Sequence, residues 1–468
     1  MKKNLLLHYG FIWFVLTTAV TSCTITVSAQ QTYSADWNSL DARPIPNWFT
    51  DAKFGIFIHW GVYSVPAWAP VGNEYATYSK YAEWYWNRLV TDSSKVGKAF
   101  RDFHHNSYGP NFKYQDFAPQ FKADLFKPEQ WANIFKDAGA QYVVLTAKHH
   151  DGFALWPSAE SWNWNAVDAG PHRDLAGDLT NAVKAKGMHM GFYYSLYEWF
   201  NPLYKINVDQ YVSSHMLPQL KDLVVRYKPD IIWPDGEWDY PSDTWKSKEF
   251  LAWLYNESPV KTSVVVNDRW GKETRSKHGG YFTTEYDIVH NENASGKKFD
   301  HPWEECRGIG GSFGYNRNEN LADYLTSDAL IKMLIQKVAR GGNLLLDIGP
   351  AADGTIPVIM QERLADLGAW LKVNGEAIYG TGVGPQPAGN AVFSTQKARD
   401  VYLFITAKQN KAIEISLKNR PLKLTLIGAD NEIRFSYKAG KLSIQLLDLY
   451  PNLPSGGLAW VIKLEAVM

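Results

Sequence analysis

The stretch Phe54-Gly55-Ile56-Phe57-Ile58-His59-Trp60-Gly61 decides how the rest of the chain is interpreted. A short apolar run of strand length ends in a histidine and a tryptophan, and a glycine follows. Six such runs occur in series, tens of residues apart, and each delivers residues that can do chemistry. Because the active site of a (β/α)8 barrel lies at the C-terminal ends of its strands, this pattern predicts that fold. The residues delivered by the other runs are Lys148-His149-His150-Asp151, Tyr193-Tyr194-Ser195, Asp235, Asn267-Asp268-Arg269 and Glu285.

Segments of helical character separate these runs. Residues 128–139 begin with proline and end with glycine, which is the asymmetry expected of a helix. A last apolar run at 343–349 predicts a final barrel strand. We therefore expect a TIM-like catalytic barrel over residues 30–380. Further helices are predicted at 175–187, 208–227, 327–340 and 361–372.

The pattern changes after a turn-rich segment around residue 385. Runs that alternate apolar and polar residues, each bounded by turn residues, predict antiparallel strands. They indicate a small all-β sandwich domain over residues 385–468. A structural partner to the barrel is preferred to a carbohydrate-binding module as its role. The runs lie at 400–406, 412–417, 422–426 and 441–446.

The N-terminus has the features of a signal peptide. A Lys2-Lys3 pair precedes an apolar stretch at 5–20, and Val27-Ser28-Ala29 is a small-x-small cleavage site. We expect cleavage near Ala29, a signal peptide over 1–29, and a secreted or periplasmic protein. The alternative is a lipoprotein anchored through Cys23, because Val20-Thr21-Ser22-Cys23 resembles a lipobox. No stretch is long and apolar enough to predict a transmembrane segment.

Composition excludes some classes of function. Lys+Arg and Asp+Glu both number 48, so the zero formal net charge gives no support to a nucleic-acid partner. Cleavage would remove or acylate Cys23 and leave Cys306 without an internal disulfide partner. The aromatic content of 15% suits sugar recognition, since flat rings pack against the apolar faces of sugars. A large aromatic barrel core explains the same content equally well.

Two of the residues at strand ends are carboxylates, Asp235 and Glu285. A pair of carboxylates in a cleft lined by tryptophan and histidine predicts the cleavage of a glycosidic bond. Asp235 could instead cap the next helix. Glu304 and Glu305 rival Glu285 as the general acid, because both segments offer an aromatic setting that raises a carboxyl pKa. The local sequence does not choose between them.

His59, His149 and His150 could bind either a metal ion or the hydroxyl groups of a sugar. Adjacent side chains on a strand point to opposite faces, which argues against His149 and His150 as a pair of metal ligands. Hydrogen bonding of neutral His59, His149 and His150 to sugar hydroxyls is preferred. Arg269 could hold a hydroxyl, orient a carboxylate or pair with Asp268. No His-x-His pair and no cysteine ligands support a metal site, so no metal is predicted. No glycine-rich stretch matches a phosphate-binding fingerprint, and no cofactor is predicted.

Longer motifs, in order along 48–380, carry a resemblance to a known family. The chain resembles the bacterial, secreted α-L-fucosidases of glycoside hydrolase family 29. The motifs are Trp48-Phe49-x-Asp51-x-Lys53-Phe54-Gly55-Ile56-Phe57-Ile58-His59-Trp60-Gly61, Tyr81-Ala82-Glu83-Trp84-Tyr85, Ala147-Lys148-His149-His150-Asp151-Gly152-Phe153, Trp233-Pro234-Asp235-Gly236, Asn267-Asp268-Arg269-Trp270-Gly271, Ser312-Phe313-Gly314-Tyr315-Asn316-Arg317 and Gly341-Gly342-Asn343-Leu344-Leu345-Leu346-Asp347-Ile348-Gly349-Pro350.

The resemblance implies an exo-acting, retaining α-L-fucosidase that releases terminal fucose from fucosylated oligosaccharides or glycoconjugates. Asp235 matches the family's nucleophile and Glu285 its general acid/base, with Glu304 as the fallback for the second role. Tyr193 or Tyr194 matches a tyrosine near the nucleophile. The positions that match residues holding fucose are His59, Glu83, His149, His150, Trp233, Arg269 and, beside the sugar's methyl group, Phe313.

A retaining mechanism requires the two carboxyl groups to lie about 5–5.5 Å apart. The alternative function is a catalytically inactive fucose-binding protein on the same fold. Linkage preference is expected to depend on the segments at 69–80 and 86–115 around the barrel mouth. The sequence leaves open the linkage, the oligomeric state and the choice between periplasm and cell surface.

Overall fold

The structure is a computed structural model, and it describes residues 31–287, 301–387, 391–407, 412–429, 433–445 and 459–467. The predicted signal peptide, Cys23 included, lies outside the described residues. Within these ranges, no helix has both the length and the apolar character needed to cross a membrane.

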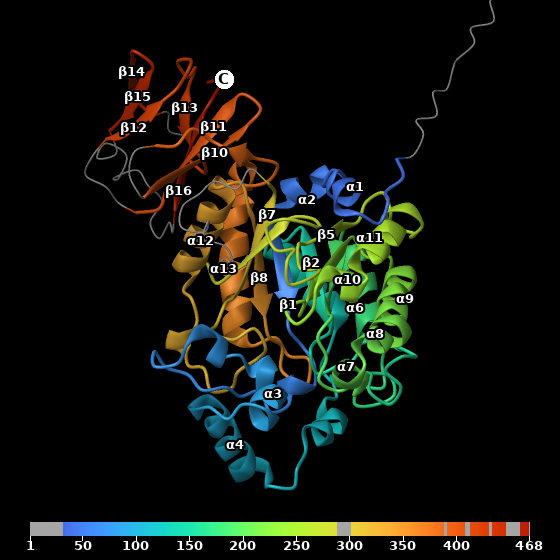
Figure 1. Cartoon of the computed structure of the whole chain (residues 1–468). Coiled ribbons are helices and arrows are strands. Elements are labelled where there is room, and N and C mark those ends of the chain that lie inside the picture. Colours follow the sequence, from blue (N-terminus) through green and yellow to red (C-terminus); the bar gives the residue numbers. More distant parts are fainter. Residues whose placement is uncertain are drawn as a thin grey trace, which may run out of the picture. The chain divides into compact units, whose positions relative to one another are not determined.

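Eight parallel strands form one curled sheet in the order β5-β4-β3-β2-β1-β8-β7-β6, with helices packed around it (Figure 1). β5 and β6 stand at the two ends of this order, and an isolated parallel bridge pairs Asn267 with Tyr281 between them. The predicted barrel is confirmed. The strands are β1 (Phe54–Ile58), β2 (Tyr142–Lys148), β3 (His189–Ser195), β4 (Ile231–Asp235), β5 (Val265–Val266), β6 (Phe282–Glu285), β7 (Trp303–Gly308) and β8 (Asn343–Ile348).

The helices fall into groups around the sheet. Those that follow strands and cover the sheet are α5 (Pro128–Asp137), α6 (Leu175–Ala185), α8 (Val208–Tyr211), α9 (Leu217–Tyr227), α10 (Ser242–Trp245), α11 (Ser247–Asn256), α12 (Ser327–Ala339) and α13 (Val358–Asn374). Figure 1 shows α1 (Trp37–Asp41) and α2 (Asn47–Ala52) at one end of the strands, and α3 (Tyr85–Val90), α4 (Lys95–Tyr108) and α7 (Leu203–Ile206) at the other. The 3-10 turns are η1 (Val62–Ser64), η2 (Thr77–Ser79), η3 (Ala82–Trp84), η4 (Tyr114–Gln120), η6 (Leu321–Asp323) and η7 (Gly375–Ala377).

The helix predicted over 208–227 is interrupted. A π-helical turn, η5 (Val212–Met216), joins α8 to α9. Pro218 stands in the first turn of α9 and has no N–H to donate to the carbonyl four residues before it. A wider turn just ahead of a proline accommodates that missing bond, so the chain continues in the same direction.

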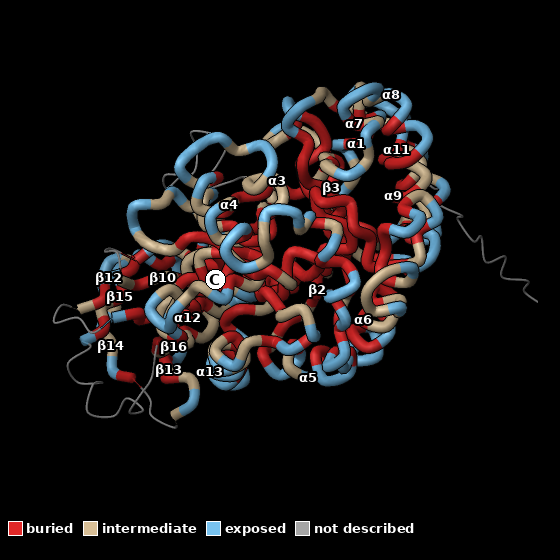
Figure 2. The backbone as a smooth tube through the Cα atoms, turned by 90° about the horizontal axis from the view of Figure 1, so that it is seen from below, coloured by how far each residue is buried: buried red, intermediate tan, exposed pale blue. Residues whose placement is uncertain are grey.

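The strands place alternate side chains inside and outside the barrel. Ile56 and Ile58 pack outward against the helices, whereas Phe57 belongs to the interior core. Phe49 of α2 packs into the same interior core, so the strands' N-terminal end is filled with apolar side chains. Figure 2 shows the central strands β2 and β3 as buried beneath a more exposed outer layer. The inward-facing position that follows an interior apolar residue, such as His59 after Phe57, therefore lies at the C-terminal end of the strands, where the barrel opens.

The C-terminal residues form two antiparallel sheets, ordered β13-β16-β11-β10-β9 and β12-β15-β14, which confirms the predicted all-β domain. Both sheets contribute to one apolar core, with Leu403 and Leu464 on one side and Ile415 and Leu442 on the other. The strands are β9 (Gly382–Val383), β10 (Val392–Lys397), β11 (Asp400–Ile405), β12 (Ile413–Ser416), β13 (Leu424–Leu426), β14 (Phe435–Lys438), β15 (Lys441–Ile444) and β16 (Trp460–Leu464).

Candidate active site

A pocket of about 320 Å³ lies at the C-terminal ends of the barrel strands. Phe57 and Trp233 lie within β1 and β4, before the ends of these strands, and both belong to the interior core as well as to the pocket lining, so we describe them as its floor. Every predicted site residue lines it except Tyr194 and Glu304. The lining residues are Phe57, His59, Tyr78, Tyr81, Glu83, Trp84, Arg88, His149, His150, Tyr193, Trp233, Asp235, Trp238, Arg269, Arg275, Glu285, Cys306 and Phe313.

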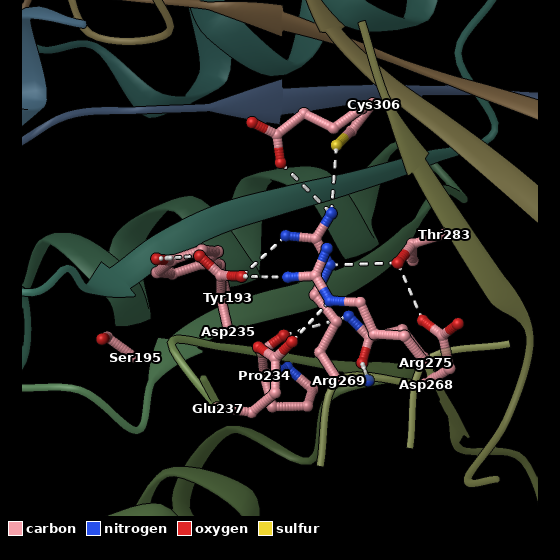
Figure 3. A network of polar contacts seen from close by, with 12 residues as sticks. Tyr193, Ser195, Pro234, Asp235, Glu237, Asp268, Arg269, Arg275, Thr283 and Cys306 are labelled. Atoms are coloured by element: carbon pink, nitrogen blue, oxygen red, sulfur yellow. Dashed lines mark hydrogen bonds and ion pairs between the residues drawn. The ribbon is translucent and has the colours of Figure 1, made fainter. Parts of the chain in front are cut away.

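Asp235 ends β4, and its carboxylate is held on both oxygens. Arg269 Nη1 donates to Oδ1 at 2.6 Å, and the Tyr193 hydroxyl donates to Oδ2 at 2.9 Å (Figure 3). Arg275 Nη2 lies 3.6 Å from Oδ1, and His150 Nε2 lies 3.9 Å from Oδ2. Burial by itself would raise the pKa of Asp235, but the positive charges of Arg269 and Arg275, together with the hydrogen bond from Arg269, outweigh it and lower the pKa to about 2. The carboxylate is therefore ionised at neutral pH.

Glu285 ends β6 and shares a guanidinium with Asp235. Arg269 Nη2 donates to Glu285 Oε2 at 3.3 Å, and the Tyr81 hydroxyl donates to Oε1 at 3.0 Å. The Arg269 side chain is fixed in turn by Thr283, whose Oγ1 accepts from Nε at 3.0 Å, and by the face of Trp233, 4.4 Å from Cζ. One rigidly held arginine thus binds both predicted catalytic carboxyl groups.

His149 and His150 lie side by side, which corrects the expectation that they face opposite ways. β2 ends at Lys148, so both histidines stand in the turn beyond the strand. Their ring centroids are 4.1 Å apart, and both rings line the pocket. Burial lowers the pKa of each, to about 4 for His150, so both are neutral at neutral pH.

Hydrogen bonds fix the tautomer of His150. The Ser195 hydroxyl has one proton and donates it to the Tyr197 carbonyl at 2.5 Å. Nδ1 of His150, 2.6 Å from that same Ser195 oxygen, must therefore carry its own proton. The neutral ring then presents Nε2 as an acceptor near Asp235.

His59 is held by Asp347, the inward-facing residue near the end of β8. Its Nδ1 lies 2.6 Å from Asp347 Oδ1. Burial lowers the pKa of His59 to about 3 and raises that of Asp347, so the imidazole is neutral and Nε2 is left for a ligand. His59 also stacks on Phe313, with ring centroids 4.8 Å apart.

Glu83 supplies a further buried carboxyl group to the wall. The backbone N–H of Gly314 donates to its Oε2 at 2.8 Å, and the Ser312 hydroxyl lies 3.2 Å from the same oxygen. Burial nevertheless raises the pKa of Glu83 to about 8. This carboxyl group is therefore largely protonated at neutral pH, so it can donate as well as accept a hydrogen bond with a ligand hydroxyl.

Two predicted residues lie elsewhere. Tyr194 follows the inward-facing Tyr193, so it points outward, and its hydroxyl donates to Gln219 at 2.8 Å. Glu304 is fully buried beneath the pocket floor, where it accepts from Trp233 Nε1 at 2.9 Å and from the Tyr142 hydroxyl at 2.5 Å. Neither side chain lines the pocket.

The prediction omitted several lining residues. Tyr81 opens the motif that contains the predicted Glu83, but its contact with Glu285 spans 204 residues, so the local sequence could not show that it reaches this carboxyl group. Arg275 could have been suspected as a second cation six residues after Arg269. Asp347 does not line the pocket, but it comes near the end of an apolar strand, as Asp235 does, and the same reasoning would have selected it.

Metal ligation has little support from the side-chain arrangement. Among the described residues, no group of three or more His, Cys, Asp or Glu is arranged to hold a metal ion.

The buried Cys306 is a free thiol whose sulfur lies 3.9 Å from Arg269 Nη2.

Comparisons with known proteins agree with this geometry. A family model described as alpha-L-fucosidase matches residues 20–376. The tissue alpha-L-fucosidase of Rattus norvegicus is 44% identical over 452 residues, which cover 93% of each chain. That of Homo sapiens is 44% identical over 449 residues, covering 93% of this chain and 92% of the human one. The structure also resembles the Thermotoga maritima alpha-fucosidase in complex with fucose, with TM-score 0.76 and 35% identity over 92% of this chain and 100% of that one. The chain therefore belongs to the α-L-fucosidase family of glycoside hydrolases.

Proposed function

We propose that the protein is an exo-acting, retaining α-L-fucosidase in which Asp235 is the nucleophile and Glu285 the general acid/base. The observation that carries this proposal is the shared guanidinium of Arg269, which donates to both carboxyl groups. The pocket floor is closed by Phe57 and Trp233. A pocket that is closed at one end accepts the terminal sugar of a glycan, which supports exo action.

In the first step, Asp235 attacks the anomeric carbon and forms a covalent glycosyl ester, while Glu285 gives its proton to the departing oxygen. The low pKa of Asp235 keeps the nucleophile ionised. In the second step, Glu285 takes a proton from water as that water attacks the same carbon. Two inversions give net retention. Arg269 and Tyr193 hold the nucleophile's oxygens in place throughout.

The remaining wall residues suit a deoxy sugar. Neutral His59, His149 and His150, together with Glu83, offer donors and acceptors to hydroxyl groups. In the described part of the chain nothing hydrogen-bonds to His149 Nδ1, which is buried. Phe313 and the floor provide an apolar surface for the methyl group of L-fucose. We infer that Tyr193, Trp233 and Arg269 complete the fucose site, and that Tyr194 takes no part in it.

The test is hydrolysis of an aryl α-L-fucoside by the wild type and by Asp235→Ala, Glu285→Ala and Glu304→Ala, with and without azide. Azide can replace the missing base in the second step. We expect Asp235→Ala to be inactive and Glu285→Ala to regain turnover as fucosyl azide is formed. Glu305→Gln is the control, because Glu305 faces away from the pocket toward Thr284 and Asp287. It should keep most activity.

Other outcomes would contradict the assignment. Azide rescue of Glu304→Ala in place of Glu285→Ala would move the acid/base to Glu304. A β-configured first product, seen by NMR before mutarotation, would exclude retention. A wild type that binds fucose but cleaves neither the aryl fucoside nor fucosylated oligosaccharides would establish a binding protein.

We also propose that the protein is exported and cleaved near Ala29. This proposal rests on the N-terminal sequence alone. Mass spectrometry of the mature N-terminus from the native host would show Gln30 as the first residue. A lipidated Cys23 would establish the lipoprotein alternative.

A further inference from the structure

The mouth of the pocket carries two large aromatic side chains that remain open to solvent. Tyr78, in η2, is 38% exposed, and Trp238, which follows β4, is 37% exposed. Both line the pocket. An exposed ring at the entrance of a sugar pocket can pack against the apolar face of a second sugar. The two rings therefore mark the candidate positions for the unit to which fucose is attached.

Tyr78 lies on the side of the proposed acid/base. Its ring meets Tyr81 edge-on, with centroids 5.6 Å apart, and the Tyr81 hydroxyl donates to Glu285 at 3.0 Å. Burial and the negative charge of Glu285 raise the pKa of Tyr78, which agrees with this proximity. The segment is anchored, since Arg88 Nη2 donates to the Tyr78 carbonyl at 2.9 Å.

Trp238 lies on the side of the nucleophile. Its ring centroid is 5.4 Å from that of His150, whose Nε2 faces Asp235. Its other aromatic neighbours are Tyr197, at 5.9 Å, and Trp84, at 6.1 Å. In a retaining mechanism the leaving oxygen departs next to the acid/base, on the face of the sugar opposite the nucleophile. The leaving group must therefore pass Tyr78 rather than Trp238.

We propose that Tyr78 forms the first leaving-group subsite, where its ring packs against the apolar face of the pyranose to which fucose is linked. This inference rests on the proposed role of Glu285, because that role sets the direction of departure. The ligand class is a glycan in which fucose is attached to another sugar, as opposed to a simple alkyl fucoside. The subsite lies within the 69–80 segment, so it also assigns one determinant of substrate preference.

The experiment compares kcat/KM for methyl α-L-fucoside with kcat/KM for the best-cleaved member of a panel of fucosyl-galactose and fucosyl-N-acetylglucosamine disaccharides. The readout is the disaccharide-to-methyl ratio. We expect Tyr78→Ala to lower this ratio about fivefold to tenfold, the scale of one aromatic packing contact. Tyr78→Phe keeps the ring and should keep the ratio. Trp162→Ala is the matched control, because Trp162 is 77% exposed and does not line the pocket.

Three results would overturn the inference. An unchanged ratio in Tyr78→Ala would remove the packing contact. A ratio that falls in Trp238→Ala but not in Tyr78→Ala would place the second sugar on the nucleophile's side. An equal loss on both substrates would show that Tyr78 acts through Tyr81 and Glu285. Failure of the wild type to cleave methyl α-L-fucoside or any disaccharide would instead contradict the proposed function itself.

Discussion

Replacing Glu304 by glutamine and by alanine distinguishes two roles for this residue, proton transfer to the substrate and support of the pocket floor. Glu304 accepts from Trp233 Nε1 and the Tyr142 hydroxyl, and Trp233 carries the Arg269 guanidinium on its face. Glutamine keeps one oxygen for Trp233, and its amide N–H can donate to the Tyr142 oxygen. We therefore expect Glu304→Gln to retain kcat/KM within about tenfold of the wild type, a loss of no more than about 1.4 kcal/mol in transition-state stabilisation.

Alanine at the same position should cost far more. It leaves two buried donors without an acceptor, at about 1–3 kcal/mol each, so the free energy of unfolding should fall by about 2–6 kcal/mol before any cavity cost. Arg269 then loses its fixed support, and kcat should fall with it. Thermal unfolding and aryl fucoside kinetics, with azide present and absent, measure both effects. Equal inactivity of Glu304→Gln and Glu304→Ala, with azide rescue of both, would refute the supporting role.

The pH dependence gives a second measure of the same residue. Burial raises the pKa of Glu304 from 4.5 to about 7. Between these values the folded protein keeps a proton that the unfolded chain has released, so stability falls as pH rises through this window. The shift corresponds to about 3 kcal/mol. Glu304→Gln lacks this contribution, so its stability relative to wild type should improve from pH 5 to pH 8. A pH-independent difference would contradict the raised pKa.

Three further results are expected. Arg269→Lys should lower kcat/KM by about 100-fold, because a lysine cannot keep both charge-assisted bonds to Asp235 and Glu285; a loss under fivefold would show that the shared guanidinium is dispensable. Arg275→Met removes a positive charge 3.6 Å from Asp235 and should raise the pKa of that carboxyl, so the acid limb of the kcat/KM profile should move to higher pH; an unmoved limb would contradict this coupling. Exhaustive chelation should leave aryl fucoside hydrolysis unchanged, and activity restored only by added metal would contradict the metal-free mechanism.

The strands of the barrel could be predicted where they are apolar. β7 could not be predicted as a strand, and its contacts show why. Its sequence, Trp-Glu-Glu-Cys-Arg-Gly over 303–308, lacks an apolar run because polar groups are satisfied on both faces. Glu304 faces inward to Trp233, and Glu305 faces outward, where the Thr284 hydroxyl and the Asp287 N–H donate to it. Such partners come from other strands, and the local sequence cannot show them.

The site was predictable to the extent that it follows strand ends. Asp235 and Glu285 each end a strand and line the pocket, as expected. Tyr193 could not be told from Tyr194, because the sequence does not say which phase of the alternation faces inward. Tyr81 and Tyr78 come from the long segment between β1 and β2. Tyr81 donates to Glu285, and the charge of Glu285 raises the pKa of Tyr78, so the places of both residues depend on the whole tertiary fold.

The seam between β5 and β6 gives the proposed catalytic groups a second role. The strands on either side meet through the Asn267–Tyr281 bridge, and residues 267–281 between them carry Arg269 and Arg275. Arg269 spans the seam, since it bonds to Asp235 on β4 and to Glu285 on β6. These charged side chains therefore connect β4 to β6 across the part of the barrel where the strands are paired by a single bridge. A substitution of Arg269, Asp235 or Glu285 removes a contact that closes the barrel as well as a group at the site. The free energy of unfolding and kcat are therefore expected to fall together, whereas many active-site substitutions raise stability as they lower activity.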